Sequence, residues 1–258
     1  MELKSEHDMA PTITYVTVFN GALHALRLSW NSFAFFHPKQ ALFWCYNNGD
    51  KTAARDYANA QADLVIHSEY NDGHGPGLNT LCRQVKTRYT LVCDMDIEFL
   101  RPTAHRMILE LQSEPDALCV AYPSHRDECV PVVHFGWHLM GQKRINPCCA
   151  LFDTQKLNQI LPYFGFEVFW SSLNFYDVGG VLYNVARAAG MKVLEPEWVR
   201  DSVRHYGSMG ALLVGAFPVG SSDHTRTTNN YKLIEERSKL YPDPKPFLVE
   251  PDPKQITV

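Results

Sequence analysis

The sequence predicts a single α/β domain built on a mostly parallel central sheet with helices on both faces. Through the first half of the chain, short apolar runs alternate with amphipathic stretches in the order strand, helix, strand, helix, strand. The length of 258 residues and the 45% hydrophobic composition are sufficient for one sizeable buried core. We therefore expect one domain over residues 1–258.

The first half supplies the elements of this pattern in order. Strands and helices are expected, alternately, over residues 13–19, 23–36, 41–46, 52–61 and 64–66. Residues 73–77 combine glycines with a proline, so we interpret them as a flexible loop that opens an amphipathic stretch ending near Lys86. The continuous apolar run at residues 89–93 then predicts a central strand buried on both faces.

The second half continues the pattern less regularly. Helices are expected over residues 101–111 and 178–189, and strands over residues 117–122, 149–152 and 192–194. Residues 130–144 are aromatic and rich in histidine but show no periodicity. The tail from residue 241 to 258 is rich in proline and lacks glycine, so it is expected to be extended.

Composition and charge exclude several classes of protein. The net charge is -4 and both signs are mixed along the chain, whereas nucleic-acid binders carry a basic stripe, so nucleic acid is not an expected partner. No apolar run approaches the ~20 residues that span a bilayer, and residues 1–11 are too polar for a secretory signal. Seven cysteines without a Cys-x-x-Cys pair indicate no disulfide framework. A soluble, cytoplasmic protein without a membrane span is expected.

Two carboxylates, Asp94 and Asp96, follow the expected central strand directly. Ligands of open α/β sheets collect at the carboxyl ends of the strands, and residues i and i+2 of a strand share one face. Both carboxylates can therefore approach one Mg²⁺ or Mn²⁺ that bridges to a diphosphate. An isolated Asp-x-Asp more often opens a turn. Here the apolar runs at residues 91–93 and 97–100 on either side favour the metal site.

The segment at residues 89–97 resembles the DxD segment of GT-A glycosyltransferases, particularly the large group of family-2-like enzymes. Segments at residues 16–20, 44–50 and 71–86 fit the same order, and the resemblance covers residues 12–207. It implies a GT-A, Rossmann-like fold. It further implies a nucleotide-sugar-binding half at residues 12–100, an acceptor-side half at 101–215 and a partly extended C-terminal extension at 216–258.

The same resemblance implies a set of donor-site residues. Thr17, Asn48 and Asp50 would surround the base and ribose, Arg83 or Lys86 would lie near the base or phosphates, and Asp94 would face the diphosphate. UDP is the donor nucleotide that the resemblance favours. From the residues alone, the run at 47–50 favours a surface turn after a strand, and its position in the order of segments shifts the balance toward the donor site.

The resemblance also implies a metal shell and a catalytic base. His205 is similar to the histidine that completes the metal site of many GT-A enzymes, so Asp94, Asp96 and His205 would together hold Mn²⁺ or Mg²⁺. Asp177 falls on the position of the catalytic base of inverting family-2-like enzymes, although Tyr176 stands where a glutamate is common. Asp177 could instead cap the helix expected from residue 178, and one residue can do both.

His134 and His138 have the i, i+4 spacing of a helical zinc pair, but Gly136 interrupts a helix and no glutamate follows His134. We interpret them, with Trp137, as a lining for an acceptor groove. Phe175 and Tyr176 lie near Trp170 in an aromatic cluster that we assign to core packing.

The sequence thus predicts a metal-dependent glycosyltransferase. It would transfer a sugar from a nucleotide-sugar donor to a hydroxyl of a glycan or small-molecule acceptor, with inversion. One alternative is a nucleotidyltransferase of related fold, although residues 18–22 lack its glycine-rich basic signature. The other is a non-catalytic module that binds a sugar or nucleotide.

Overall fold

The computed structural model describes residues 11–38, 40–124, 132–134, 137–139, 143–162, 169, 178–207 and 222–244. Its helices and strands are, in chain order, β1 (Ile13–Phe19), α1 (Leu23–Phe36), β2 (Ala41–Asn48), α2 (Ala53–Gln61), β3 (Leu64–Ser68), α3 (His74–Cys82), β4 (Tyr89–Cys93), β5 (Ile97–Phe99), α4 (Ala104–Ser113), β6 (Ala117–Tyr122), β7 (Val132–His134), β8 (Trp137–Leu139), β9 (Asn146–Asp153), α5 (Thr154–Ile160), α6 (Gly180–Ala188), β10 (Lys192–Leu194), α7 (Glu197–Ser202), β11 (Val203–His205) and α9 (Ser222–Ser238).

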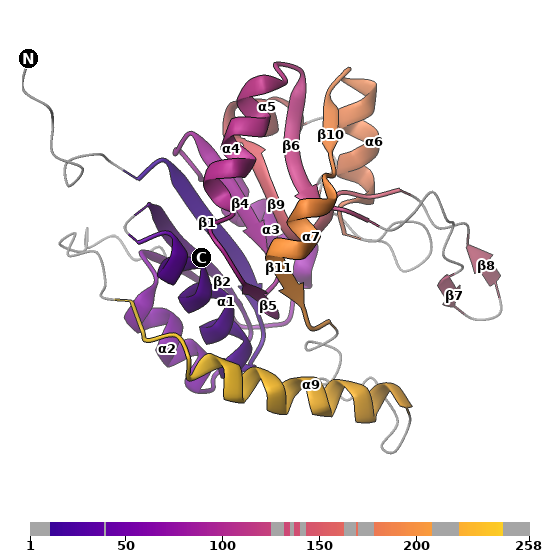
Figure 1. Ribbon diagram of the computed structural model, residues 1–258. Helices are drawn as coiled ribbons and strands as arrows, with labels where there is room; N and C mark the ends of the chain where they lie inside the picture. Colours follow the sequence, from indigo (N-terminus) through magenta and orange to yellow (C-terminus); the bar gives the residue numbers. More distant parts are fainter. Residues whose placement is uncertain are drawn as a thin grey trace, which may run out of the picture.

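Seven strands form the central sheet in the order β10-β6-β9-β4-β1-β2-β3 (Figure 1). β1 pairs in parallel with β2 and β4, and the pairs β2–β3 and β6–β10 are also parallel. β9 runs antiparallel to both of its neighbours. The prediction of a mostly parallel sheet with a buried strand at residues 89–93 is therefore confirmed.

Helices cover both faces of this sheet. Side chains of α1, α2, α4, α7 and α9 pack into one hydrophobic core, and side chains of α3, α5 and α6 pack into a second core on the opposite face. β4 is buried along its whole length between these two layers. Burial on both faces explains why this strand is a continuous apolar run in the sequence.

A small second sheet of two strands connects the segment that follows β4 with the C-terminal part of the domain. Three residues separate the end of β4 from the start of β5, and β11 pairs with β5 in antiparallel fashion. α9 packs against α1 and extends along the lower edge of the molecule in Figure 1. This arrangement brings residues near 205 and 237 next to the segment that follows β4.

The structure differs from the sequence prediction at residues 73–77, which form the start of α3 and not a flexible loop. Pro76 is tolerated there because the N–H groups of a first helical turn have no acceptor within the helix. Gly77 is required by close packing, since a Cβ atom would lie 2.8 Å from Cγ2 of Val18. α9 and the β7–β8 pair were also not predicted.

His37 provides a testable feature of the fold, because it caps α4 from a distance in sequence. Its Nε2 accepts hydrogen bonds from the backbone N–H groups of Thr103 (3.0 Å) and Ala104 (3.3 Å), and its ring stacks on Phe33. Burial lowers the pKa of His37 from 6.5 to about 4. The imidazole must be neutral to accept these bonds, so protonation opposes folding.

We expect His37 to make the protein less stable as the pH falls from about 6.5, its pKa in the unfolded chain, to about 4, its pKa in the folded protein. In that window the unfolded state binds the proton and the folded state does not, so the free energy of unfolding falls by about 2 to 3 kcal/mol. Urea unfolding at pH 7 and pH 4.5 would measure this. His37→Gln has no imidazole, so its free energy of unfolding should fall by about 2 to 3 kcal/mol less than that of the wild type between pH 7 and pH 4.5. Identical pH dependence in both proteins would contradict the assignment.

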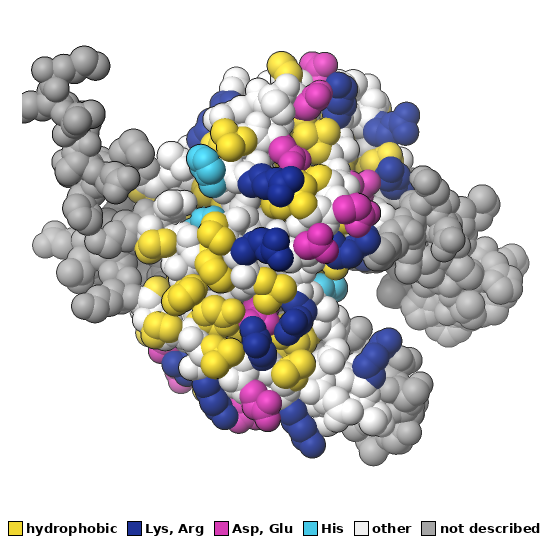
Figure 2. Space-filling model, viewed as in Figure 1, with side chains coloured by type: hydrophobic (Ala, Val, Ile, Leu, Met, Phe, Trp, Pro, Cys, Tyr) yellow, Lys and Arg dark blue, Asp and Glu magenta, His cyan; other side chains and the backbone are white. Residues whose placement is uncertain are grey.

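The face of the molecule in Figure 2 shows no continuous stripe of side chains of one charge. Lys and Arg side chains lie there among Asp, Glu and hydrophobic side chains. Within the described part of the chain, no helix has both the length and the apolar character needed to cross a membrane.

Candidate metal and donor site

Asp94 and Asp96 leave the carboxyl end of β4, where the chain turns into β5. The Asp94 N–H donates to the Cys148 carbonyl at 3.2 Å, and Ser29 Oγ donates to the Asp94 carbonyl at 3.1 Å. These bonds connect the turn to β9 on one side and to α1 on the other. The two carboxylates therefore emerge from a backbone that is held in place, at the sheet edge where α/β proteins bind ligands.

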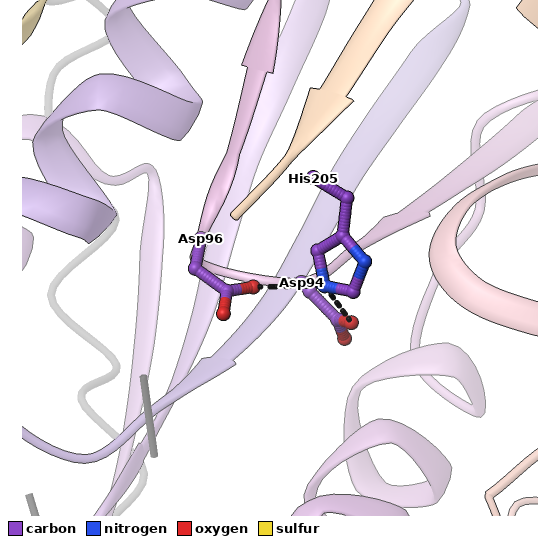
Figure 3. Close-up of side chains that lie close together, drawn as sticks. All are labelled: Asp94, Asp96 and His205. Carbon is purple, nitrogen blue, oxygen red and sulfur yellow. Dashed lines mark ion pairs between the residues drawn. The ribbon is translucent and has the colours of Figure 1, made fainter. Parts of the chain in front are cut away.

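His205 reaches the same place through the pairing of β11 with β5. In this pairing His205 lies opposite Ile97, the residue after Asp96. Its Nε2 lies 3.6 Å from Oδ2 of Asp94 and 3.4 Å from Oδ1 of Asp96, and the three side chains point toward one another (Figure 3). One ligand atom from each residue lies within 4.8 Å of the other two.

The electrostatics of the cluster indicate a deficit of positive charge. Burial raises the pKa of the Asp94 carboxyl, and the charge of Asp96 adds to this, while His74, His205 and Arg144 act in the opposite direction. Burial alone would lower the pKa of His205, but a hydrogen bond to Asp96 and the charges of both aspartates raise it overall. A divalent cation would relieve the repulsion between the two carboxylates.

The residues present fit a hard or borderline divalent ion. Two carboxylates and one imidazole are a donor set that Mn²⁺ accepts, and Mg²⁺ prefers the oxygen ligands among them. In addition, the buried Oδ1 of Asp94 accepts no hydrogen bond from the described residues and has only an ion-pair contact with His74, at 3.4 Å. The structure thus brings together the three residues predicted to bind metal.

Sequence reasoning missed two positively chargeable neighbours of this cluster. His74, the first residue of α3, places its Nε2 3.4 Å from Oδ1 of Asp94. Arg144, just before β9, is close enough to influence the pKa of Asp94 and of His205. His74 begins α3, and Arg144 precedes β9, whose first residues pair with the end of β4. These positions in the chain order are the signal that could have identified both residues.

Asn48 and Asp50 lie at the carboxyl end of β2, on the same edge of the sheet. The Asn48 amide donates to Asn71 Oδ1 at 2.6 Å and accepts from the Asp72 N–H at 2.7 Å. The Asp50 carboxylate accepts from the N–H and the hydroxyl of Thr52, at 3.1 and 2.9 Å. Both side chains are buried and hold the loops that follow β2 and β3.

The other predicted donor-site residues lie in β1 and between α3 and β4. Thr17 is fully buried inside β1. Arg83 is the C-cap of α3 and Lys86 precedes β4, and both are exposed. α3 runs back from the carboxyl edge of the sheet toward the start of β4, so these two residues lie toward the end of β4 that is opposite to Asp94. The geometry does not place them with the metal cluster.

Asp177 lies outside the described residues, as do Trp170, Phe175 and Tyr176. The alternative role of Asp177 as a helix cap is wrong, because α6 begins at Gly180 and its N-cap is Gly179, with φ of 90°. His134 and His138 lie on the antiparallel strands β7 and β8, so they do not form a helical i, i+4 pair.

Comparison with known proteins defines the class. The model of the family described as Glycosyl transferase family 2 matches residues 17–168, which is more than half of the chain. The chain therefore belongs to glycosyl transferase family 2, and the nucleotidyltransferase alternative is not supported. A comparison with curated protein sequences finds no match.

Solved structures show the fold. The mannosyltransferase PcManGT from Pyrobaculum calidifontis, in complex with GDP-Man and Mn²⁺, is similar with a TM-score of 0.53 and 10% identity, over 90% of this chain and 74% of that one. S. aureus TarS 1-349 has a TM-score of 0.43 and 17% identity, over 58% of this chain and 49% of that one. The likeness to PcManGT confirms the predicted GT-A fold.

Proposed function

We propose that this glycosyltransferase is metal-dependent and transfers a sugar from a nucleoside-diphosphate sugar to a hydroxyl of a glycan or small-molecule acceptor, with inversion. The observation that carries the proposal is the cluster of Asp94, Asp96 and His205 at the carboxyl end of β4. Each of these side chains can bind a divalent ion, and the family uses sugar donors whose leaving group is anionic. The PcManGT complex with GDP-Man and Mn²⁺ supports this combination.

Asp94, Asp96 and His205 would hold the ion. Bound there, a divalent ion supplies a Lewis acid that neutralises the departing nucleoside diphosphate. His74 and Arg144 add chargeable nitrogen groups beside Asp94, and their role would be to bind diphosphate oxygens. The donor would lie against the nucleotide-sugar-binding half at residues 12–100, and the acceptor against residues 101–215, with 216–258 as the C-terminal extension.

Asp177 would act as the catalytic base and remove the proton from the acceptor hydroxyl as the oxygen attacks the anomeric carbon. Support comes from Gly179, two residues later in the sequence, whose carbonyl accepts a hydrogen bond from the Ile145 N–H at 3.2 Å. Ile145 immediately precedes β9, and the start of β9 lies at the carboxyl edge of antiparallel β4. Residue 179 is therefore held at the edge of the sheet that carries the metal cluster.

We expect a nucleoside diphosphate together with Mn²⁺ to stabilise the folded protein. A ligand at about 100 times its dissociation constant adds about 2.7 kcal/mol, which raises the melting temperature of a domain of this size by about 5 to 10 °C. UDP is the nucleotide that the family resemblance favours, and GDP and ADP complete the panel. Thermal unfolding with each nucleotide, with Mn²⁺ or with EDTA, measures the effect.

No stabilisation by any of these nucleotides in the presence of Mn²⁺ would contradict the donor site. The reaction itself is tested by incubation with nucleotide sugars and Mn²⁺ and by measurement of released nucleoside diphosphate. Stabilisation without release, in the presence of a panel of glycan and small-molecule acceptors, would indicate the non-catalytic module.

A further inference from the structure

A buried carboxylate, Glu98, lies in β5 two residues beyond the metal cluster and joins three distant parts of the chain. Its side chain is fully buried. Arg237 of α9 donates from Nε to both carboxylate oxygens, at 2.9 and 3.1 Å, and from Nη2 to Oε1. Tyr206 donates its hydroxyl to Oε2 at 2.7 Å, and Tyr241 donates its hydroxyl to Oε1 at 2.9 Å. A carboxylate so paired is held in one position.

Tyr206 connects this cluster to the metal site, because it follows His205 directly. Its hydroxyl bonds to Glu98, its N–H donates to the Asp96 carbonyl at 3.0 Å, and its carbonyl accepts from Nδ2 of Asn230 at 2.7 Å. Every polar group of Tyr206 is therefore bonded. One of these bonds goes to the backbone of Asp96, another residue of the metal site.

The two tyrosines on Glu98 differ in their position relative to the metal site. Successive side chains of an extended segment point to opposite sides, so Tyr206 can point to Glu98 while His205 points to the aspartates. Tyr241 donates to the same carboxylate, and its hydroxyl also lies 3.5 Å from the Phe99 carbonyl, but Tyr241 lies beyond α9 and is not next to a metal-site residue. A purely structural role of the Glu98 cluster would make both hydroxyls equivalent.

We propose that Tyr206 is a positioning residue, which holds the His205 imidazole at the metal site through its bonds to Glu98 and Asp96. The inference rests on the metal site of the proposed function. It assigns the role to a residue that need not touch the ion or the substrate. It also gives helix α9 a function in metal binding, because Arg237 holds Glu98 and Asn230 donates to the Tyr206 carbonyl.

The test compares Tyr206→Phe with the matched control Tyr241→Phe. Each variant keeps its ring in the core and removes one hydroxyl from Glu98, which retains Arg237. Mn²⁺ affinity is measured without nucleotide by electron paramagnetic resonance of the free ion, at a temperature where unfolding scans show both variants folded. We expect Tyr206→Phe to weaken Mn²⁺ binding about 10-fold, as loss of a group that orients a ligand does, and Tyr241→Phe to change it less than about twofold.

A second comparison separates positioning from a general loss of stability. In a His205→Ala background, Tyr206→Phe should leave Mn²⁺ affinity unchanged, because the imidazole that it positions is absent, while the melting temperature should fall as it does in the wild-type background. Equal Mn²⁺ affinities of the two single variants, or a further 10-fold loss in the His205→Ala background, would overturn the proposal.

The outcomes also distinguish this inference from the proposed function. Wild-type protein that binds Mn²⁺ and transfers sugar, with Tyr206→Phe and Tyr241→Phe equal in Mn²⁺ affinity, would overturn the positioning role alone. Wild-type protein that transfers sugar but binds no Mn²⁺ would overturn the positioning role and the metal dependence together.

Discussion

Asp96→Ala is expected to weaken Mn²⁺-dependent binding of the nucleoside diphosphate at least about 100-fold, and His205→Ala about 10-fold. Loss of a group that only orients a metal ligand costs about 10- to 100-fold in affinity, so loss of a fixed ligand should cost more. The Asp96 side chain is 8% exposed and sits between β4 and β5, whereas the His205 side chain is 30% exposed at the end of a two-stranded sheet. Water can therefore replace the imidazole more easily than the carboxylate.

Charge increases the difference between the two variants. The Asp96 carboxylate offsets part of the charge of the cation, and a neutral imidazole does not. Both effects should disappear in chelator, because each residue acts through the ion. The exposed carboxylate of Asp201, on the helix α7 that precedes β11, provides a control: Asp201→Ala should bind as the wild type does.

Calorimetric titration of the nucleotide with and without Mn²⁺ measures these affinities. Unchanged metal-dependent affinity in His205→Ala would remove His205 from the metal site. The same result for Asp96→Ala would remove the metal site from the proposed function.

The central strand and its two aspartates were predictable because burial on both faces makes β4 a continuous apolar run, and the charges that follow are conspicuous. His205 was predictable only through the family resemblance. Its distance to Asp96 depends on the pairing of β11 with β5, two strands of three residues each. Strands this short contain too few residues for alternation to predict their register.

α9 was not predictable from periodicity, because polar contacts hold it in place. Among its described side chains Ile234 is the one buried apolar residue, and the helix is fixed by Arg237 on Glu98 and by Asn230 on the Tyr206 carbonyl. Such contacts leave no apolar stripe in the sequence.

Topology adds positional information to the predicted donor site. A helix that connects parallel strands starts at the carboxyl edge of the sheet and ends at the other edge. His74 at the start of α3 therefore lies near Asp94, and Arg83 and Lys86 at its end do not. Chain order alone contains this information, whereas the family resemblance at residues 71–86 is too loose to place individual side chains.

Asp177→Asn is expected to lower the rate of sugar transfer by about 10²- to 10⁴-fold, the usual contribution of a general base. An amide keeps the size and hydrogen bonding of the carboxylate but does not accept the proton. The N-cap of α6 is Gly179, so this substitution leaves the N-cap residue of that helix unchanged. Binding of Mn²⁺ and of the nucleoside diphosphate should be unchanged, since neither requires the base.

Initial rates at saturating donor, combined with calorimetric donor affinity, separate the base from a binding residue. Asp116→Asn is the matched control, because Asp116 is exposed and precedes β6 at the edge of the sheet opposite Asp94.

The pH dependence of the rate is a second test. If Asp177 is the base, the wild-type rate should fall at low pH, and the residual rate of Asp177→Asn should not show that decrease. A near-normal rate in Asp177→Asn would show that another group accepts the proton. A rate that falls together with donor affinity would place Asp177 in the donor site.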